Sequence, residues 1–312
     1  MSSDMLKVTI DGSALSYADL GSGPRTVVML HGGGPGSSGA SNFAPCLAFF
    51  DKRVRVLMID QPGFGRSELP SFEGSYLDMS AERVLKFMDQ LGIDRADLVG
   101  NSLGGGVALS VARDHPDRVG GLVLMNPAGA EVPLLALHTA EMGMIRDYYS
   151  GSGPSLERIR EFAHEMVNNP SALPPELIEE RYRNSLLPGA EKAMRAAART
   201  FDPLQAKEEA RDSRKGLLWT QLQDILAPTL LMWGREDRAA PLDRAIFLEA
   251  RLPNAHLYVF PNCGHWIQIE RPEAFAGITL QFLESLGEFE RTRASEAERK
   301  PAKSERSGTH VA

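Results

Sequence analysis

A serine between glycines is the residue whose setting in this chain most directly suggests chemistry. Gly100-Asn101-Ser102-Leu103-Gly104 follows an apolar run and precedes a segment with helical spacing. This is the arrangement of a G-x-S-x-G turn that exposes a nucleophilic serine. Glycine is needed beside such a serine because a sharp strand-to-helix turn leaves little space for side chains. The alternative is a surface serine in a glycine-rich turn, and the strand before it and the helix after it argue against that.

A histidine far along the chain is the candidate base. A serine hydroxyl is a weak nucleophile at neutral pH, so it needs a base within hydrogen-bond reach and a third group that orients the base. His265 lies in Cys263-Gly264-His265-Trp266, shortly after the strand-like run at 256–260. The other six histidines fall on a loop, helices, a strand or the C-terminal segment, where a lone histidine is usually structural.

An aspartate completes the set. Asp237 follows the strand-like run at 228–233 and is the candidate acid, with Glu236 and Asp243 as its rivals. An acid after the preceding strand is excluded because that position holds Asn126. The three groups then stand in the order serine, acid, histidine, which this kind of nucleophile turn requires.

A glycine-rich segment supplies candidate donors for an oxyanion. HGGGPG at 31–36 follows the apolar run at 26–30, and glycine lets main-chain amides approach developing negative charge. We expect one donor at Gly33, with Gly32 as the alternative, and a second at the amide of Leu103. A dinucleotide site is a weak alternative, because the G-x-G-x-x-G spacing is missing.

The elements that position these residues are predicted from hydrophobic spacing. Two short alternating runs between 6 and 20 are joined by Asp11-Gly12, which predicts a hairpin. Near-continuous apolar runs predict strands buried on both faces, and segments with 3.6-residue spacing between them predict helices, which together indicate an α/β fold with a mostly parallel sheet. The predicted strands are 26–30, 54–59, 96–100, 121–126, 228–233 and 256–260, and the predicted helices are 80–91, 103–113, 243–252 and 272–286.

The same patterns predict how the chain is divided. An α/β core covers 1–129, an inserted helical cap with several proline breaks covers 130–215, and the core resumes over 216–287. The charged remainder, 288–312, has almost no large apolar residue, so we expect a disordered tail. A docking segment is the functional alternative for it.

Bulk properties limit the partners. The 312 residues are 43% hydrophobic and 24% charged, with a net charge of −7 and a pI near 5.6. This acidic balance argues against nucleic acid and membrane partners and favours a small-molecule substrate. Cys46 and Cys263 are expected to be free thiols. Without a leader pattern or about 18 consecutive apolar residues, we expect a cytoplasmic protein.

Several motifs together resemble one known family. They are HGGGPG at 31–36, Ser41-Asn42-Phe43, DQPGFG at 60–65, GNSLGGG at 100–106, WGREDR at 233–238 and CGHW at 263–266. The chain resembles the meta-cleavage product hydrolases over about 24–287, and Leu103 with the triple glycine is most similar to those acting on biphenyl and seco-steroid cleavage products. The resemblance implies an α/β-hydrolase fold with a helical cap, no metal or cofactor, and a homodimer or larger homo-oligomer.

The resemblance also implies a reaction and binding residues. A 2-hydroxy-6-oxo-hexa-2,4-dienoate would be split at a carbon–carbon bond into 2-hydroxypenta-2,4-dienoate and a carboxylic acid. Asn42, Asn101, Trp266 and Gly32 would line the dienoate end, and Arg181 in the cap would pair with its carboxylate, as a planar guanidinium can do bidentately. Without the resemblance, Arg181 would be interpreted as a solvated helix arginine.

Other readings of the triad stay open. In the mechanism that we expect, His265 first moves a proton to carbon and Ser102 then attacks the ketone. The sequence is compatible both with an acyl-enzyme on Ser102 and with direct attack by water. A carboxylesterase or lactonase shares the same triad, and a non-catalytic ligand receptor is compatible with it. Cap residues such as Met142 and Tyr148 follow no known pattern, so the acyl-side preference is open.

Overall fold

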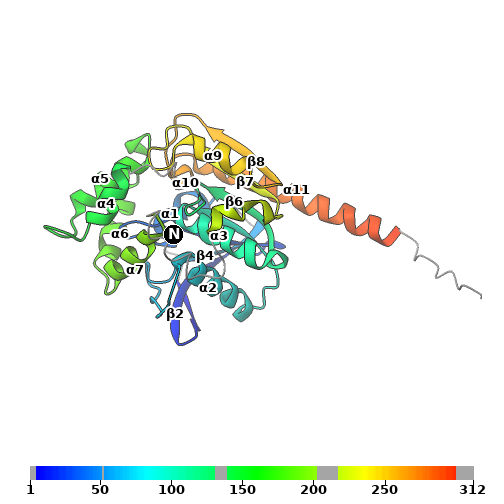
Figure 1. Ribbon diagram of the computed structural model, residues 1–312, viewed down its shortest axis with the longest axis horizontal. Coiled ribbons are helices and arrows are strands. Elements are labelled where there is room, and N and C mark those ends of the chain that lie inside the picture. The colour runs from blue at the N-terminus through cyan, green and yellow to red at the C-terminus, as the bar shows by residue number, and fades with distance from the viewer. Residues whose placement is uncertain (1–4, 51–52, 131–138, 202–216, 300–312) are drawn as a thin grey trace, which may run out of the picture.

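The computed structural model describes residues 5–50, 53–130, 139–201 and 217–299. Eight strands form one sheet in the order β1-β2-β4-β3-β5-β6-β7-β8, with helices on both faces (Figure 1). Strands β1 and β2 pair antiparallel, β2 pairs antiparallel with β4, and all other neighbours are parallel. The strands are β1 Leu6–Ile10, β2 Ser13–Leu20, β3 Arg25–Leu30, β4 Val54–Ile59, β5 Ala96–Asn101, β6 Val119–Met125, β7 Thr229–Gly234 and β8 Ala255–Phe260.

The opening hairpin forms as predicted. Ile10 pairs with Ser13, so the turn has two residues, and both Asp11 and Gly12 have positive φ angles of 44° and 78°. Such a turn matches the twist of the two strands. The Asp-Gly pair therefore sets the register of the antiparallel edge.

The parallel strands lie within one or two residues of their predicted positions. Strands β5, β6 and β7 are buried along their whole length, which is why they appear in the sequence as continuous apolar runs. The α-helices are α1 Gly39–Leu47, α2 Tyr76–Gln90, α3 Leu103–Asp114, α4 Ala140–Asp147, α5 Leu156–Met166, α6 Pro175–Ser185, α7 Ala190–Ala198, α9 Leu242–Glu249, α10 Ile267–Glu270 and α11 Pro272–Arg299. Short 3-10 helices cover Pro116–Arg118, Pro170–Ala172, Arg199–Phe201, Leu218–Thr220 and Leu222–Asp224.

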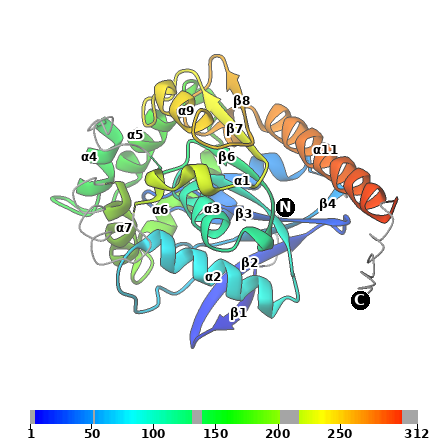
Figure 2. The ribbon, with the colours of Figure 1, turned by 45° about the vertical axis from the view of Figure 1, so that its right-hand side comes forward.

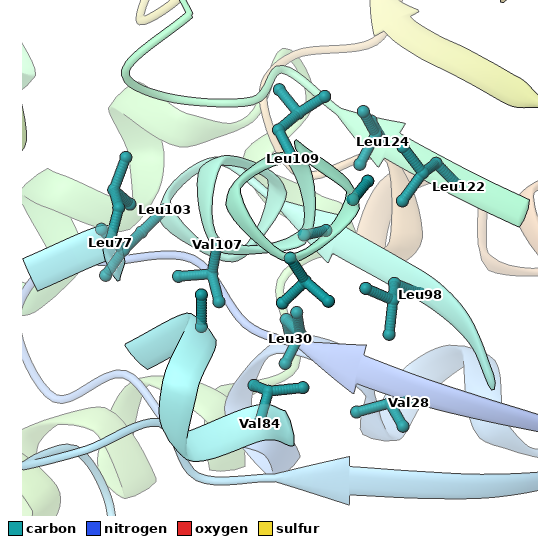
Figure 3. Packing of buried hydrophobic residues seen from close by; sticks show 14 of the residues in the cluster. Val28, Leu30, Leu77, Val84, Leu98, Leu103, Val107, Leu109, Leu122 and Leu124 are labelled. Carbon is teal, nitrogen blue, oxygen red and sulfur yellow. The ribbon is translucent and has the colours of Figure 1, made fainter. Parts of the chain in front are cut away.

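Alternate residues of the strands serve two hydrophobic layers. Leu98 and Leu122 pack with helices α2, α3 and α9 on one face, whereas Val99 and Val123 pack with α1 and α11 on the other. Figure 3 shows Val107 of α3 among the leucines of the first layer. Within the described residues, no helix is long and apolar enough to cross a membrane.

Helices α4 to α7 come between β6 and β7 in the sequence and lie together on one side of the sheet (Figures 1 and 2). They have a hydrophobic cluster of their own, which includes Tyr148, Ile159 and Phe162 and reaches Trp266 of the core. The exact borders of the predicted cap stay a prediction, since 131–138 and 202–216 lie outside the described residues.

The last helix extends beyond its predicted end at 286, and the predicted domain border at 288 stays a prediction. Helix α11 runs to Arg299 and projects away from the rest of the fold (Figure 1), whereas the sequence predicts disorder from 288. Charged residues at 290–299 are compatible with a helix because glutamate, arginine and alanine have high helix propensity. The remaining part of the predicted tail, 300–312, lies outside the described residues.

Candidate active site

Ser102 stands at the turn between β5 and α3 in a strained backbone conformation. Its φ of 50° and ψ of −113° are rare for a residue with a side chain. The turn is held by main-chain bonds, because the Ser102 N–H donates to the Met125 carbonyl at 2.7 Å and the Ser102 carbonyl accepts from Gly106 and Ala128. The strain therefore belongs to a fixed turn that presents one hydroxyl group.

The glycines of the turn are required by contact. A Cβ on Gly100 would lie 2.5 Å from the Gly104 carbonyl oxygen, and a Cβ on Gly104 would lie 2.1 Å from the Leu30 carbonyl oxygen. Both neighbours are main chain and cannot move aside cheaply. The spacing of the G-x-S-x-G pattern thus follows from how closely β5, α3 and β3 approach one another.

His265 and Asp237 meet beside this turn. The Nδ1–H of His265 donates to Asp237 Oδ2 at 2.8 Å, and both side chains are buried. Asp237 Oδ1 accepts the amides of Ala239 and Ala240, each at 2.8 Å. These bonds fix the carboxylate and leave Nε2 of the imidazole as the proton acceptor. Ser102 and His265 line the same cavity.

The two rival acids are placed elsewhere. Glu236 Oε2 accepts the amide of Cys263 at 3.0 Å, so it joins the Asp237 loop to the His265 loop without touching the imidazole. Asp243 accepts the amide of Arg244 at the start of α9. Of the three candidates, the structure brings Asp237 to His265.

Asn126, which in the sequence excluded a catalytic acid at that position, contacts His265 in the structure. Its Nδ2 donates to the His265 carbonyl at 2.9 Å and lies 3.2 Å from His265 Nδ1. Because Nδ1 carries the proton given to Asp237, the second contact is packing and the first is the hydrogen bond. Asn126 therefore holds the backbone of the histidine.

The glycine-rich segment after β3 offers one open amide. The Gly32 N–H donates to Asn42 Oδ1 at 3.2 Å, whereas the structure gives the Gly33 amide no acceptor within the described residues, and Gly33 lines the cavity. The Leu103 amide is in the first turn of α3, where it has no intrahelical acceptor. This arrangement favours Gly33 over Gly32 as an oxyanion donor beside Leu103.

His31 fixes the backbone of that segment. Its Nε2 accepts the Gln61 N–H at 2.9 Å and its Nδ1–H donates to the Gly32 carbonyl at 2.7 Å. Complete burial lowers the pKa of His31 to about 4. A neutral imidazole with both nitrogens bonded is therefore a structural support for the glycines.

A cavity lies above Ser102. Its walls come from the strand ends and from the cap helices α4 and α5. The described lining residues are Gly32, Gly33, Asn101, Ser102, Asn126, Pro127, Ala128, Met142, Ile145, Phe162, Met166, Ala239, Ala240, Arg244, His265 and Trp266.

Arg181 is completely buried between the cap and the core. Its guanidinium donates to the Pro35 carbonyl at 3.1 Å and to Ser37 Oγ at 2.8 Å, and it lies 4.7 Å from the centre of the Trp266 ring. Burial lowers its pKa to about 10, so it stays charged at neutral pH. The interpretation as a solvated arginine is wrong. Trp266 lines the cavity, and Arg181 packs on its ring.

The two asparagines predicted at the dienoate end differ in access. Asn101 lines the cavity, and its Nδ2 lies 3.5 Å from the carbonyls of Met125 and His265. Asn42 is buried and holds the Gly32 amide from behind. The structure thus brings Asn101 to the cavity and places Asn42 one layer further back.

Sequence comparison identifies the family. The family model described as alpha/beta hydrolase fold matches residues 25–272. A 2-hydroxy-6-oxononadienedioate/2-hydroxy-6-oxononatrienedioate hydrolase from Paraburkholderia phymatum is 38% identical over 86% of this chain and 90% of its own length. The chain belongs to the meta-cleavage product hydrolases of the α/β-hydrolase fold.

Two further members of this family have a different or unspecified acyl group. A 2-hydroxy-6-oxo-6-phenylhexa-2,4-dienoate hydrolase from Burkholderia cepacia is 37% identical over 88% of this chain and 95% of its own length. The solved structure of a meta-cleavage product hydrolase from Pseudomonas fluorescens IP01 has a TM-score of 0.74 and 29% identity, and covers 90% of this chain and 97% of its own. The family is thus clear, and the two curated relatives are named for substrates with different acyl groups.

A buried glutamate connects the cap of this hydrolase to the histidine loop. Glu270 accepts the Gly264 amide at 2.6 Å and the amides of Asn168 and Asn169 at 2.9–3.1 Å. The Met166 carbonyl accepts from the amide of His265 at 2.7 Å. The segment after α5 therefore runs beside the histidine loop and is bonded to it.

An arginine makes a matching connection on the acid side. Arg238 follows Asp237 and donates to the carbonyls of His164, Glu165 and Val167 at 2.8–3.3 Å, at the C-terminal end of α5. Sequence reasoning missed Glu270, Asn126 and Arg238 as parts of the site. For Arg238 and Glu270 the one available signal was their position within five residues of Asp237 and His265, and for Asn126 it was the position directly after β6.

Proposed function

We propose that this hydrolase cleaves a carbon–carbon bond in 2-hydroxy-6-oxo-hexa-2,4-dienoate type meta-cleavage products. The products would be 2-hydroxypenta-2,4-dienoate and a carboxylic acid. Ser102, His265 and Asp237 act as the triad, the amides of Gly33 and Leu103 bind the oxyanion, and Asn42, Asn101, Gly32, Trp266 and Arg181 form the dienoate end. The names of the relatives at 37–38% identity support this reaction.

One observation carries the substrate assignment, and it is the buried charge of Arg181. A guanidinium without an anionic partner costs free energy when it is removed from water, and no carboxylate among the described residues forms an ion pair with it. Arg181 stacks on Trp266, which lines the cavity. A simple ester has no use for such a cation, whereas the C1 carboxylate of a dienoate would neutralise it.

The chemistry follows from the poor leaving ability of carbon. Proton transfer, assisted by His265, moves the enol hydrogen of the substrate to carbon 5 and gives a ketone at carbon 2. Ser102 gives its proton to Nε2 of His265 as its oxygen adds to the carbon-6 ketone, and the new oxyanion accepts bonds from Gly33 and Leu103. The bond between carbons 5 and 6 breaks with its electron pair going to the dienolate, which Arg181 stabilises and which takes up the proton from His265. Water, deprotonated by His265, then hydrolyses the ester to Ser102 and releases the acid.

The test is a spectroscopic assay with a matched ester. Loss of dienolate absorbance should report turnover by the wild type, and Ser102→Ala should abolish it. Arg181→Gln should lower kcat/KM for the dienoate by about 100-fold, the value of a lost charge-assisted pair, and far less for a neutral ester. Turnover of esters with inert dienoates would overturn the proposal in favour of a carboxylesterase or lactonase.

We also propose that the hydrolase assembles into a homodimer or larger homo-oligomer and works in the cytoplasm. The family resemblance supports the first part. Light scattering coupled to size exclusion measures the mass of the assembly, and a mass of 34.1 kDa, that of one chain, would contradict the first part. Fractionation of the producing cells tests the second.

A further inference from the structure

The carbonyl of Gly33 is bonded to a buried serine, Ser37. The Oγ–H of Ser37 donates to this carbonyl at 2.7 Å, and the residue is completely buried. The same Oγ accepts a hydrogen bond from Nη2 of Arg181 at 2.8 Å. A guanidinium has donors only, so the hydroxyl cannot donate to Arg181 and its one proton is left for Gly33. The chain of bonds from Arg181 through Ser37 to Gly33 therefore has a fixed direction.

Gly33 is held on its other side by His31. The Nδ1–H of His31 donates to the Gly32 carbonyl, and this carbonyl belongs to the same peptide group as the Gly33 N–H. A peptide group is planar, so a bond that fixes its carbonyl also fixes the direction of its N–H. Glycine has the freest backbone of all residues, and these two bonds hold the peptide groups before and after Gly33. Its amide is therefore aimed before an oxyanion forms, as an effective donor requires.

The charge of Arg181 strengthens the bond made by Ser37. A hydrogen bond from an ionised donor is stronger than one between neutral groups. It also polarises the hydroxyl that accepts it, so the next bond, from this hydroxyl to the Gly33 carbonyl, becomes stronger as well. Burial and, to a smaller extent, the charge of Arg181 lower the pKa of His31. The charge thus acts on both residues that hold Gly33.

We infer that Ser37 is a positioning residue, which connects the proposed carboxylate-binding Arg181 to the proposed oxyanion donor Gly33. Ser37 lies outside the described lining of the cavity, so it acts through Gly33 and not on the substrate. Arg181 then has a second role, because it orients the hydroxyl even when no carboxylate is bound. The inference rests on the proposed function for the assignment of Gly33 as an oxyanion donor.

The experiment measures kcat and KM for a dienoate and the inhibition constant of benzeneboronic acid. This neutral inhibitor adds to the Ser102 oxygen, and the tetrahedral boronate places a negative oxygen where the substrate oxyanion would form. Loss of a whole oxyanion donor costs about 10²–10³ in rate, whereas Ser37→Ala frees one side of one donor. We therefore expect roughly tenfold lower kcat and roughly tenfold weaker boronate binding, with KM within about twofold of the wild type.

Ser38→Ala is the matched control. Ser38 Oγ donates to Glu180 Oε1 at 2.9 Å and accepts the Ser41 amide at 3.0 Å, so this variant also removes a buried hydroxyl bonded to cap helix α6. It should lower the urea midpoint of unfolding and leave kcat and the inhibition constant at the wild-type values. Equal losses in both variants would assign the effect to a loosened cap and overturn the inference, as would an unchanged inhibition constant in Ser37→Ala.

Arg181→Met completes a double-mutant cycle on the boronate. This inhibitor has no carboxylate for Arg181 to bind, so we expect Arg181→Met to weaken it through Ser37, and the double variant to bind it as weakly as Ser37→Ala alone. Additive losses, or wild-type inhibition of Arg181→Met, would contradict the connection. If dienoates are inert while these shifts in boronate binding appear, the proposed substrate fails and the role of Ser37 stands. If dienoates turn over and the shifts are absent, the reverse holds.

Discussion

Replacement of Glu270 by glutamine tests how the histidine loop is held. The Glu270 carboxylate is 6% exposed, and its two oxygens together accept the amides of Gly264, Asn168 and Asn169. Glutamine keeps the shape and one acceptor oxygen, but it turns an NH₂ group toward at least one of these amides. Each bond from an amide to a buried charge contributes about 1.5–3 kcal/mol. We therefore expect the free energy of unfolding to fall by about 3 kcal/mol.

The same change should affect catalysis more than binding. Gly264 immediately precedes His265, so a shifted loop moves the imidazole away from Ser102, and small misplacements of reacting groups are costly. We expect kcat for a dienoate to fall on the order of tenfold and KM to change little. Urea unfolding and steady-state kinetics measure the two effects.

Glu82→Gln makes the same chemical change on the exposed face of α2 and serves as the control. It should leave both the free energy of unfolding and kcat at the wild-type values. If Glu270→Gln unfolds within about 0.5 kcal/mol of the wild type, the range of an ordinary surface substitution, the reasoning about these amide bonds is refuted.

Four further predictions concern the backbone and pH. Gly104→Ala places a Cβ 2.1 Å from a main-chain oxygen of β3 and should lower the free energy of unfolding by more than about 3 kcal/mol. Gly277→Ala has open space in α11 and should raise the free energy of unfolding by about 0.5–1 kcal/mol. Urea titration of the two glycine variants and the wild type measures both changes. Ser102→Gly should be about 1 kcal/mol more stable than Ser102→Ala, since glycine adopts a φ of 50° without strain; equal midpoints would argue against strain at the turn. The pKa of His31 is about 4 when folded and about 6.5 when unfolded, so the unfolded chain binds the extra proton and stability falls as pH drops from 6.5 to 4. His31→Gln should therefore make the free energy of unfolding depend less on pH in this range. If the free energy of unfolding differs as much between pH 5 and pH 7 in the variant as in the wild type, this prediction is contradicted.

Most of the sheet could be predicted because buried parallel strands leave a direct trace in the sequence. Strand β4 was predicted at its observed limits, since five of the six residues of VRVLMI are buried. Helix α1 was missed because it begins among glycine and serine and contains Pro45, all weak helix formers. A capping box between Ser38 and Ser41 starts it nevertheless.

The site was predictable as far as it depends on strand ends. Asp237 and His265 could be proposed because the fold brings the C-terminal ends of parallel strands together. Glu270 could not, because its role depends on amides about 100 residues away in the chain. The contact between Arg181 and Trp266 also follows from packing between cap and core, which spacing along the sequence does not encode.

The bonds between cap and core bear on how new specificities could be built in this family. Residues 166–169 are bonded to the histidine loop, and Arg238 binds the end of α5. A chimera in which the whole predicted cap, 130–215, comes from a relative would therefore replace the residues that are bonded to the loops of His265 and Asp237. Grafts that keep α5, the segment after it and α6 native, and that vary α4, leave these loops intact. The cap is thus divisible, and α4 is its exchangeable part.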